Sequence, residues 1–324
     1  MKLASPLAVA SPPDPALWDA LVRGASGASV FHTAAWANLW LHEWGDARWE
    51  AIVVEEAGGF AGAVPFIVRR RGPVRTVYSM PFGTYGGPLV RAGHPDDVSV
   101  RRRLLEGYAR LAGSRLTVRS ELTWYGGRRD EIPDRLRSES TFTHVLPLSA
   151  DFDALAKGFT PSTRRPVRQA EESGLTIRAA SGVEEVRAFY AMAVESVRRR
   201  GGSPKPLGLY ERIFESLVPA GLARYHLVHR GEIPIAGSLH LFHQGVATTW
   251  LPVSREAFWH LRPNNFLVAR VLETLCAAGY LEYNFGASPP GAIGLIRFKE
   301  GWGARPRPVV VAGRRSLIHR KLRG

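Results

Sequence analysis

Apolar and polar positions alternate along the chain with two periods, one typical of helices and one of strands. In the first half, helical spacing predicts helices at 15–23, 32–44 and 96–112. In the same half, period-two or continuous apolar runs predict strands at 49–55, 62–69, 116–125 and 142–148. In the second half we expect helices at 151–159, 164–173, 183–200, 207–219 and 264–278. We expect strands there at 175–179, 223–229, 233–243, 246–252 and 280–285.

Both halves therefore follow one order: helix, helix, strand, hairpin, strand, helix, strand. The predicted hairpins also resemble each other, because Glu55–Phe66 and His229–His240 each place a glycine between two strands, followed by Ala-Gly. The repeated order predicts a duplicated α/β unit. A chain of 324 residues is long enough for two such domains. We place their bounds at 1–148 and 149–304, which leaves a basic tail at 305–324.

Composition narrows the class of protein. The chain is 45% hydrophobic and carries 43 Lys+Arg against 29 Asp+Glu, a formal charge of +14. It therefore has enough apolar material for two cores, and its charge favours polyanionic partners. The single cysteine, Cys276, excludes a disulfide framework and sites built from several cysteines. No apolar run approaches 18 residues, so we expect a cytoplasmic protein without an integral membrane segment.

Common catalytic signatures are absent from the sequence. It contains no G-x-x-x-x-G-K-[ST] phosphate loop, no G-x-G-x-x-G after a strand and no G-x-S-x-G nucleophile elbow. The pairs His226/His229 and His240/His243 lie three residues apart on predicted strands, where such side chains face opposite ways. We therefore expect no metal site.

The most informative segment is the last third of the chain. A helix that starts at Pro263-Asn264-Asn265, directly after a strand, directs backbone N–H groups toward a phosphate or an oxyanion. An ordinary asparagine cap on a core helix explains the same residues. Lys299 stands between Phe298 and Trp302 in a glycine-bounded segment. Its cation could stabilise negative charge there, or it could be a surface lysine.

Three motifs in this region together resemble a known family. They are Arg262-Pro263-Asn264, Tyr283-Asn284-Phe285-Gly286, and Arg297-Phe298-Lys299 followed by Trp302-Gly303. They are similar to the C-terminal motifs of Fem-like proteins (FemABX, acetyltransferase-6), which are tandem GNAT-fold aminoacyl and acyl transferases. Further matches are Ser162-Thr163-Arg164-Arg165, Arg200-Gly201-Gly202-Ser203-Pro204, Phe31-His32 with Trp36, and Tyr85-Gly86-Gly87-Pro88.

The resemblance implies a fold and an activity. The fold is α/β (α+β), with two tandem GNAT-like domains whose mixed sheets are mostly antiparallel and with the tail packed back on the first domain. The activity is transfer of an amino acid from aminoacyl-tRNA to an amine of a nucleotide-linked muropeptide or a small peptide. No cofactor is implied.

The resemblance also implies roles for residues. Lys299 and Phe298 would be catalytic, with Phe298 stacking on the terminal adenine. The residues expected at the donor are Arg262, Asn264, Asn265, Arg297 and Trp302. The residues expected at the acceptor are Lys205, Tyr210, Trp250 and Tyr85.

The chain departs from the family pattern at two places. Asn284-Phe285-Gly286 replaces the frequent Asp-Phe-Gly, so a role for that carboxylate is in doubt. The coenzyme A loop of single-domain acetyltransferases is missing at Arg255–Asn265, which makes acetyl-CoA the less favoured donor. Two alternatives stay open: a coenzyme A- or carrier-dependent N-acyltransferase of polysaccharide or secondary metabolism, and a non-catalytic RNA- or envelope-binding protein on the same fold.

Overall fold

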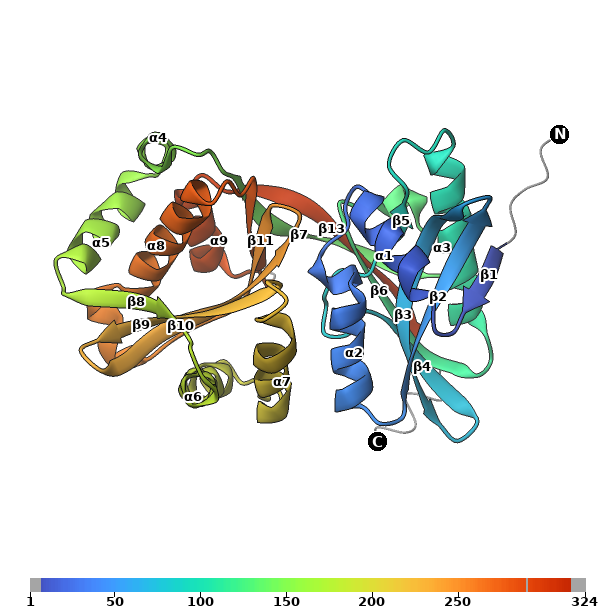
Figure 1. The fold of residues 1–324 in the computed structure, drawn as a ribbon, viewed down its shortest axis with the longest axis horizontal. Helices are drawn as coiled ribbons and strands as arrows, with labels where there is room; N and C mark the ends of the chain where they lie inside the picture. The colour runs from blue at the N-terminus through green and yellow to red at the C-terminus, as the bar shows by residue number, and fades with distance from the viewer. Residues whose placement is uncertain (1–6, 290, 316–324) are drawn as a thin grey trace. The chain divides into compact units, whose positions relative to one another are not determined.

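The computed structural model describes residues 7–289 and 291–315. The chain divides into two compact units, one made of Met1–Phe142 with Arg307–Gly324 and the other of Thr143–Pro306. Each unit has a sheet with helices on both of its faces (Figure 1).

The first unit is built around a mixed sheet of the order β1-β2-β3-β4-β6-β13, with β5 paired to β3. Its strands are β1 (Leu7–Ala10), β2 (Ala47–Glu56), β3 (Gly59–Arg71), β4 (Val74–Ser79), β5 (Leu89–Val90), β6 (Thr117–Tyr125) and β13 (Arg305–Arg315). Its helices are α1 (Pro15–Gly24), α2 (Ala34–Glu43) and α3 (Asp97–Gly113), with short 3-10 turns η1 (Val30–His32) and η2 (Arg129–Glu131). Among the described residues of this sheet, β4 and β6 run parallel and the other neighbouring strands run antiparallel. Helices α1 and α2 cover one face and α3 covers the other (Figure 1).

The second unit repeats this plan with the order β7-β12-β11-β10-β9-β8. Its strands are β7 (Arg137–Pro147, which begins in the first unit), β8 (Leu175–Ala179), β9 (Ala223–Arg230), β10 (Ile233–His243), β11 (Val246–Ser254) and β12 (Glu282–Ala287). Its helices are α4 (Phe152–Lys157), α5 (Pro161–Glu171), α6 (Val183–Arg199), α7 (Leu207–Leu217), α8 (Pro263–Ala277) and α9 (Ile293–Gly301), with the 3-10 turn η3 (Glu256–Leu261). Helices α6 and α7 cover one face, and α8 with α5 and α9 covers the other (Figure 1).

The predicted fold class is confirmed: two α/β units, each with a mixed and mostly antiparallel sheet. In each unit a strand and two helices precede a hairpin and a third strand, and a long helix then leads to a strand parallel to that third strand. The helix is α3 in the first unit and α8 in the second. A helical crossover is what joining two parallel strands requires.

The parallel pair β11 and β12 stays together for only a short distance. Its pairing runs from Val246 opposite Glu282 to Thr248 opposite Asn284. Beyond Thr248 the two strands part at their carboxyl ends. This is the edge at which open α/β sheets bind ligands.

Several elements were missing from the sequence prediction. Strands β1 and β4 were not expected, and the segment around Lys299 forms helix α9. The resemblance places the tail 305–324 back on the first domain, and the structure describes the first part of this tail. Arg305–Arg315 forms β13 and pairs with β6, and Val309 and Val310 are buried there. The rest of the predicted tail lies outside the described residues.

The described residues contain neither a membrane-spanning helix nor a cluster of metal ligands. Within 7–289 and 291–315, no helix combines the length and the apolar character needed to cross a membrane. The same residues hold no cluster of three or more His, Cys, Asp or Glu arranged for a metal ion.

Candidate functional site

Lys299 projects from α9 into the place where β11 and β12 part. Its ammonium donates to the carbonyls of Gly286 at 2.6 Å and Ala287 at 3.1 Å, and to the hydroxyl of Ser288 at 3.0 Å. The residue is only 3% exposed. Lys299 is therefore not the surface lysine of the alternative interpretation, but a buried cation held over one loop.

The loop 286–288 is shaped by Asn284 and Gly286. The Asn284 side-chain oxygen accepts from the Gly286 amide at 2.9 Å and from the Thr143 hydroxyl at 2.6 Å. Gly286 has a φ of 74°, a left-handed conformation that costs glycine little. Asn284 acts here as a hydrogen-bond acceptor in an Asx-type turn, which needs an oxygen and no negative charge. The departure from Asp-Phe-Gly therefore preserves the turn.

The charge of Lys299 is poorly compensated. Among the described residues no carboxylate lies within ion-pair distance of its ammonium, and burial lowers the pKa of Lys299 to about 8. His144, on β7, is also buried, and its pKa is lowered by burial first and by the Lys299 charge second. Burying a cation without a carboxylate partner destabilises the fold. Such groups cluster at functional sites. An anion that forms in this site would meet a cation with little solvent to screen it.

The N-terminus of α8 is the second part of the candidate site. Arg262 is exposed and caps α8 in a left-handed conformation, with φ 55° and ψ 42°. Its carbonyl accepts from the amides of Asn265 and Phe266, and Pro263 has no N–H. Within the described part of the chain, this leaves the Asn264 amide as the first-turn N–H without a carbonyl partner. The expected group of free amides is thus reduced to one.

Side chains beside the N-terminus of α8 are also joined by hydrogen bonds. The Ser254 hydroxyl accepts from the Asn264 amide side chain at 3.1 Å and from the Trp259 indole at 2.9 Å. Arg199 lies over the Trp259 ring at 4.8 Å, and Trp259 is 42% exposed. The side chain of Asn265 is half-buried. Of the expected donor residues, Asn264 is therefore joined through Ser254 to the partly exposed Trp259 ring.

The other expected residues of α9 differ in exposure. Arg297 is exposed and Phe298 is half-buried, with its ring 6.1 Å from that of Trp302. Trp302 is fully buried and packs edge-on against Phe159 at 5.0 Å. Its burial leaves no surface for a donor to touch, so its contribution is to hold the end of α9 in the core.

Three of the four expected acceptor residues lie together in the second unit. The Lys205 ammonium lies 5.1 Å from the centre of the Trp250 ring, and Tyr210 is 6.4 Å from Trp250. Trp250 is the extra residue of a β-bulge, because Leu239 pairs with Leu251 and His240 with Thr249. Bulges commonly redirect a side chain beside a site. Burial lowers the pKa of Lys205 and raises that of Tyr210 to about 12.

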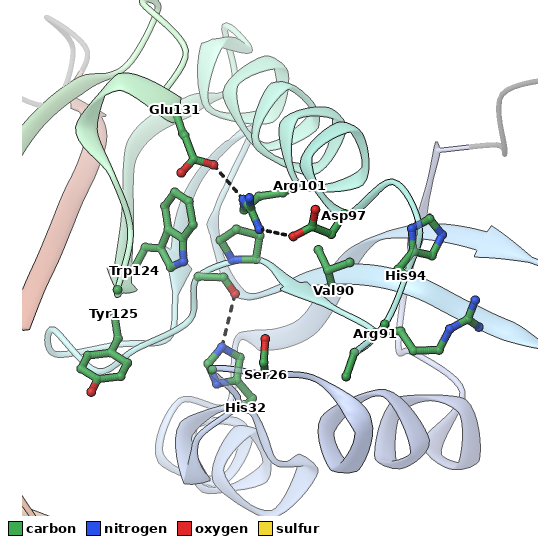
Figure 2. Close-up of a pocket in the computed structure, with 16 residues that line it drawn as sticks. Ser26, His32, Val90, Arg91, His94, Asp97, Arg101, Trp124, Tyr125 and Glu131 are labelled. Carbon is green, nitrogen blue, oxygen red and sulfur yellow. Dashed lines mark hydrogen bonds and ion pairs between the residues drawn. The ribbon is translucent and has the colours of Figure 1, made fainter. Parts of the chain in front are cut away.

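Tyr85 lies in the first unit, next to a cavity of about 580 Å³. Its ring stacks on Tyr125 at 5.1 Å, and Gly87 and Tyr125 line the cavity (Figure 2). His32 closes one side by its hydrogen bond to the Gly87 carbonyl at 3.3 Å. Gly87 must be glycine, because a Cβ there would lie 2.2 Å from the Trp124 ring.

Charged side chains surround the rest of this cavity. Arg101 bonds to Glu131 at 2.7 Å and to Asp97 at 3.3 Å (Figure 2). Arg91 and His94 also line it, and each contacts Glu56. Aromatic walls with both charges suit a large polar ligand that carries rings and ionised groups. The sequence pointed to this cavity through the Tyr85-Gly86-Gly87-Pro88 loop and through Phe31-His32.

The comparisons with known proteins concern one domain and the fold of the chain. Residues 159–300 match the family model described as acetyltransferase (GNAT) domain. Residues 159–300 are therefore similar to a GNAT domain, and the solved structures described next share the fold of the whole chain. The comparison with curated proteins gave no match.

Three solved structures have a fold similar to that of this chain. FemX has a TM-score of 0.67 at 16% identity, covering 92% of this chain and 95% of its own. L-PGS from Bacillus licheniformis has a TM-score of 0.57 at 16% identity, covering 96% of each chain. A tandem GNAT protein from the clavulanic acid biosynthesis pathway, described as without AcCoA, has a TM-score of 0.53 at 14% identity and covers 84% of each chain.

Proposed function

We propose that this protein moves an amino acid from aminoacyl-tRNA to an amine and so forms an amide bond. The observation that carries the proposal is the buried Lys299 ammonium over the loop 286–288, at the carboxyl ends of β11 and β12. Attack of an amine on an ester gives a tetrahedral oxyanion, and a desolvated cation is a strong stabiliser of that charge.

The chemistry divides among residues of the second unit. The amine nitrogen attacks the ester carbon, a C–N bond forms, and the carbonyl oxygen becomes an anion beside Lys299. Lys299 exchanges one of its longer hydrogen bonds, to Ala287 or Ser288, for this oxygen. When the C–O bond breaks, the ribose oxygen leaves with the electron pair and takes the proton that the amine nitrogen loses. Phe298, half-buried on α9, offers a ring edge to the terminal adenine.

Charge supports RNA as the carrier of the amino acid. The formal charge is +14, and α5 exposes Arg165 and Arg168 while packing against α8 and α9. Arg297 is exposed on α9 itself. Arginine on such a surface binds phosphate through two parallel hydrogen bonds. The likeness to FemX and to L-PGS agrees with aminoacyl transfer in general.

For the acceptor we propose a nucleotide-linked muropeptide or a small peptide. Lys205 over Trp250 provides a cation and a flat ring in the second unit. The cavity beside Tyr85 provides aromatic walls and both charges in the first unit. A nucleotide-linked peptide presents the complementary groups: a base, phosphates and carboxylates.

Binding of tRNA by the purified protein at about physiological salt tests the donor, with duplex DNA of equal charge as the control. We expect tRNA to bind more tightly than the duplex and to keep this preference as salt rises. Equal binding to both, lost together on adding salt, would show that the charge is generic and would contradict a tRNA donor.

A thioester donor is the second candidate. The unpartnered Asn264 amide at the start of α8 favours it, since the pyrophosphate of coenzyme A would accept from such an amide. Saturable binding of acetyl-CoA, together with transfer from it to an amine, would support this candidate over aminoacyl-tRNA.

The third candidate is a non-catalytic RNA- or envelope-binding protein. It predicts that the wild type and Lys299→Ala give the same transfer, at the background level. The first two candidates predict loss of transfer in this variant.

A further inference from the structure

A continuous chain of hydrogen bonds runs through the sheet of the second unit, on the face covered by α8. His226 Nδ1 lies 2.9 Å from His240 Nδ1, and His240 Nε2 lies 3.0 Å from the Tyr283 hydroxyl. The Thr249 hydroxyl donates to the same Tyr283 oxygen at 2.5 Å. The four residues come from β9, β10, β12 and β11 and connect four neighbouring strands.

The donors and acceptors of this chain have a consistent direction. Thr249 donates to Tyr283, so the hydrogen of Tyr283 is available to His240 Nε2. His240 then carries its hydrogen on Nδ1 and donates it to His226 Nδ1. This assignment gives every group one hydrogen to pass on and one lone pair to receive another.

The four hydrogen-bonded side chains are more deeply buried than polar groups without a function usually are. His240 is fully buried, Tyr283 is 1% exposed and His226 is 8% exposed. Burial lowers the pKa of both imidazoles, to about 4 for His226, and the Arg224 charge lowers them further. Both rings are therefore neutral at pH 7. Apolar side chains would fill this part of the core at lower cost than four linked polar groups.

The hydrogen-bond chain ends at Thr249, which lies beside the candidate site. Thr249 is the first residue of β11 beyond the pairing with β12. Its carbonyl would lie 3.2 Å from a Cβ on Gly286, whose own carbonyl accepts from Lys299. Thr249 and Lys299 therefore approach the same residue of the loop 286–288.

We propose that Thr249, Tyr283, His240 and His226 form a proton shuttle for acyl transfer at this loop. The proposal rests on the proposed function and supplies the general base that the sequence did not reveal. Thr249 touches the reacting amine, while the other three residues act through it.

The shuttle takes one proton from the amine and returns it to the leaving group. The C–N bond forms, and the amine nitrogen gives one proton to Thr249. Thr249 passes its own proton to Tyr283, and Tyr283 passes its proton to His240 Nε2, so the positive charge is shared by the two imidazoles. As the C–O or C–S bond of the donor breaks, the steps reverse and the leaving atom receives the proton. The weak basicity of the buried rings favours this rapid return, and all four residues recover their starting state.

Tyr283→Phe tests the shuttle, because it removes one oxygen and leaves the ring in place. Tyr225→Phe is the matched control: Tyr225 is equally buried in the same sheet, and its hydroxyl donates to the Tyr210 carbonyl at 2.9 Å. Steady-state transfer to a nucleotide-linked muropeptide is measured with aminoacyl-tRNA and with acetyl-CoA as donors. The dependence of kcat on the deuterium fraction of the solvent is recorded for each variant.

We expect Tyr283→Phe to lower kcat by about 10²-fold, with the KM of donor and acceptor within about twofold of wild type. The deuterium dependence is expected to be curved for the wild type, since several protons move together, and linear for Tyr283→Phe. Tyr225→Phe is expected to keep the kcat and the curvature of the wild type. Equal kcat losses in the two variants, or curvature that survives in Tyr283→Phe, would overturn the shuttle alone. A wild-type protein inactive with both donors would overturn the proposed function, and the shuttle with it.

Discussion

Lys299→Met separates the catalytic role of Lys299 from its structural one. Methionine keeps an unbranched side chain of similar length and removes the charge and three donors. The three hydrogen bonds of Lys299 join a cation to two carbonyls and a hydroxyl, and such bonds contribute about 1.5–3 kcal/mol each. Burial of the ammonium costs several kcal/mol in return. We therefore expect the free energy of unfolding to change by about 2 kcal/mol or less.

The effect on turnover is expected to be larger. Loss of one group that stabilises an oxyanion typically lowers kcat by about 10²–10³-fold, equivalent to about 2.7–4 kcal/mol. Measurements of kcat and KM for Lys299→Met, with urea unfolding of the same preparation, compare the two effects. The catalytic role would be refuted if kcat is unchanged, or if kcat falls only by the factor by which the fraction of folded protein falls.

The pH dependence gives a second measure of Lys299. Burial lowers its pKa to about 8 in the folded chain, against about 10.4 in the unfolded chain. Between these values the unfolded chain binds the extra proton, so wild-type stability rises with pH, by at most about 1.4 kcal/mol per pH unit. Activity is expected to fall in the same range because the cation is lost. The stability of Lys299→Met is expected to be flatter with pH, and an equal slope would contradict the assignment.

Three further predictions concern the acceptor and the core. Lys205→Ala is expected to raise the KM of the acceptor about tenfold, with kcat within about twofold, because the cation over the indole is lost; steady-state kinetics measure this, and an unchanged KM would count against the residue. Gly87→Ala forces the Trp124 ring into the cavity, so we expect titration calorimetry to show acceptor affinity reduced at least about tenfold, with unfolding still cooperative. His226 and His240 have lowered pKa values, so the unfolded chain takes up protons first as the pH falls from about 6.5 toward 4, and stability declines by up to about 1.4 kcal/mol per pH unit for each. Urea unfolding at several pH values is expected to show a shallower decline in the double variant His226→Gln with His240→Gln, and an equal decline would contradict this account.

Much of the fold could be predicted because the periodicity of its elements is strong. The repeated order of helices and strands carried the fold class, since each core helix and hairpin has a clear apolar pattern. Helix α9 was missed because Gly294 lies in its first turn and Gly291 and Gly301 lie before it and at its end, a spacing typical of a loop. Its stability comes from tertiary contacts, including those of Trp302 with the core.

Strand β13 could not be predicted because its pairing partner is far away in the sequence. The exposed arginines Arg305 and Arg307 suggest a solvated segment, but the core positions that follow are Val309 and Val310. The partner strand β6 lies about 190 residues earlier in the chain, as the pairing of Val309 with Tyr125 shows. Local sequence carries little information about such a distant pairing.

Spacing along one strand does not show which side chains meet across neighbouring strands. On its own strand, His226 faces the opposite way from His229. The interaction that forms is diagonal and joins His226 to His240 on the next strand. The predicted hairpin contained this information, because His226 pairs with Ser238 and so lies beside His240.

Transfer of a labelled amino acid tests the central claim most directly. The purified protein is incubated with tRNA charged with a mixture of labelled amino acids and with a nucleotide-linked muropeptide, and the product is treated with mild base. The account predicts label in a base-stable amide on the muropeptide with the wild type, and at least about 10²-fold less with Lys299→Met. Label that remains on tRNA, or reaches the muropeptide equally with both proteins, would contradict it.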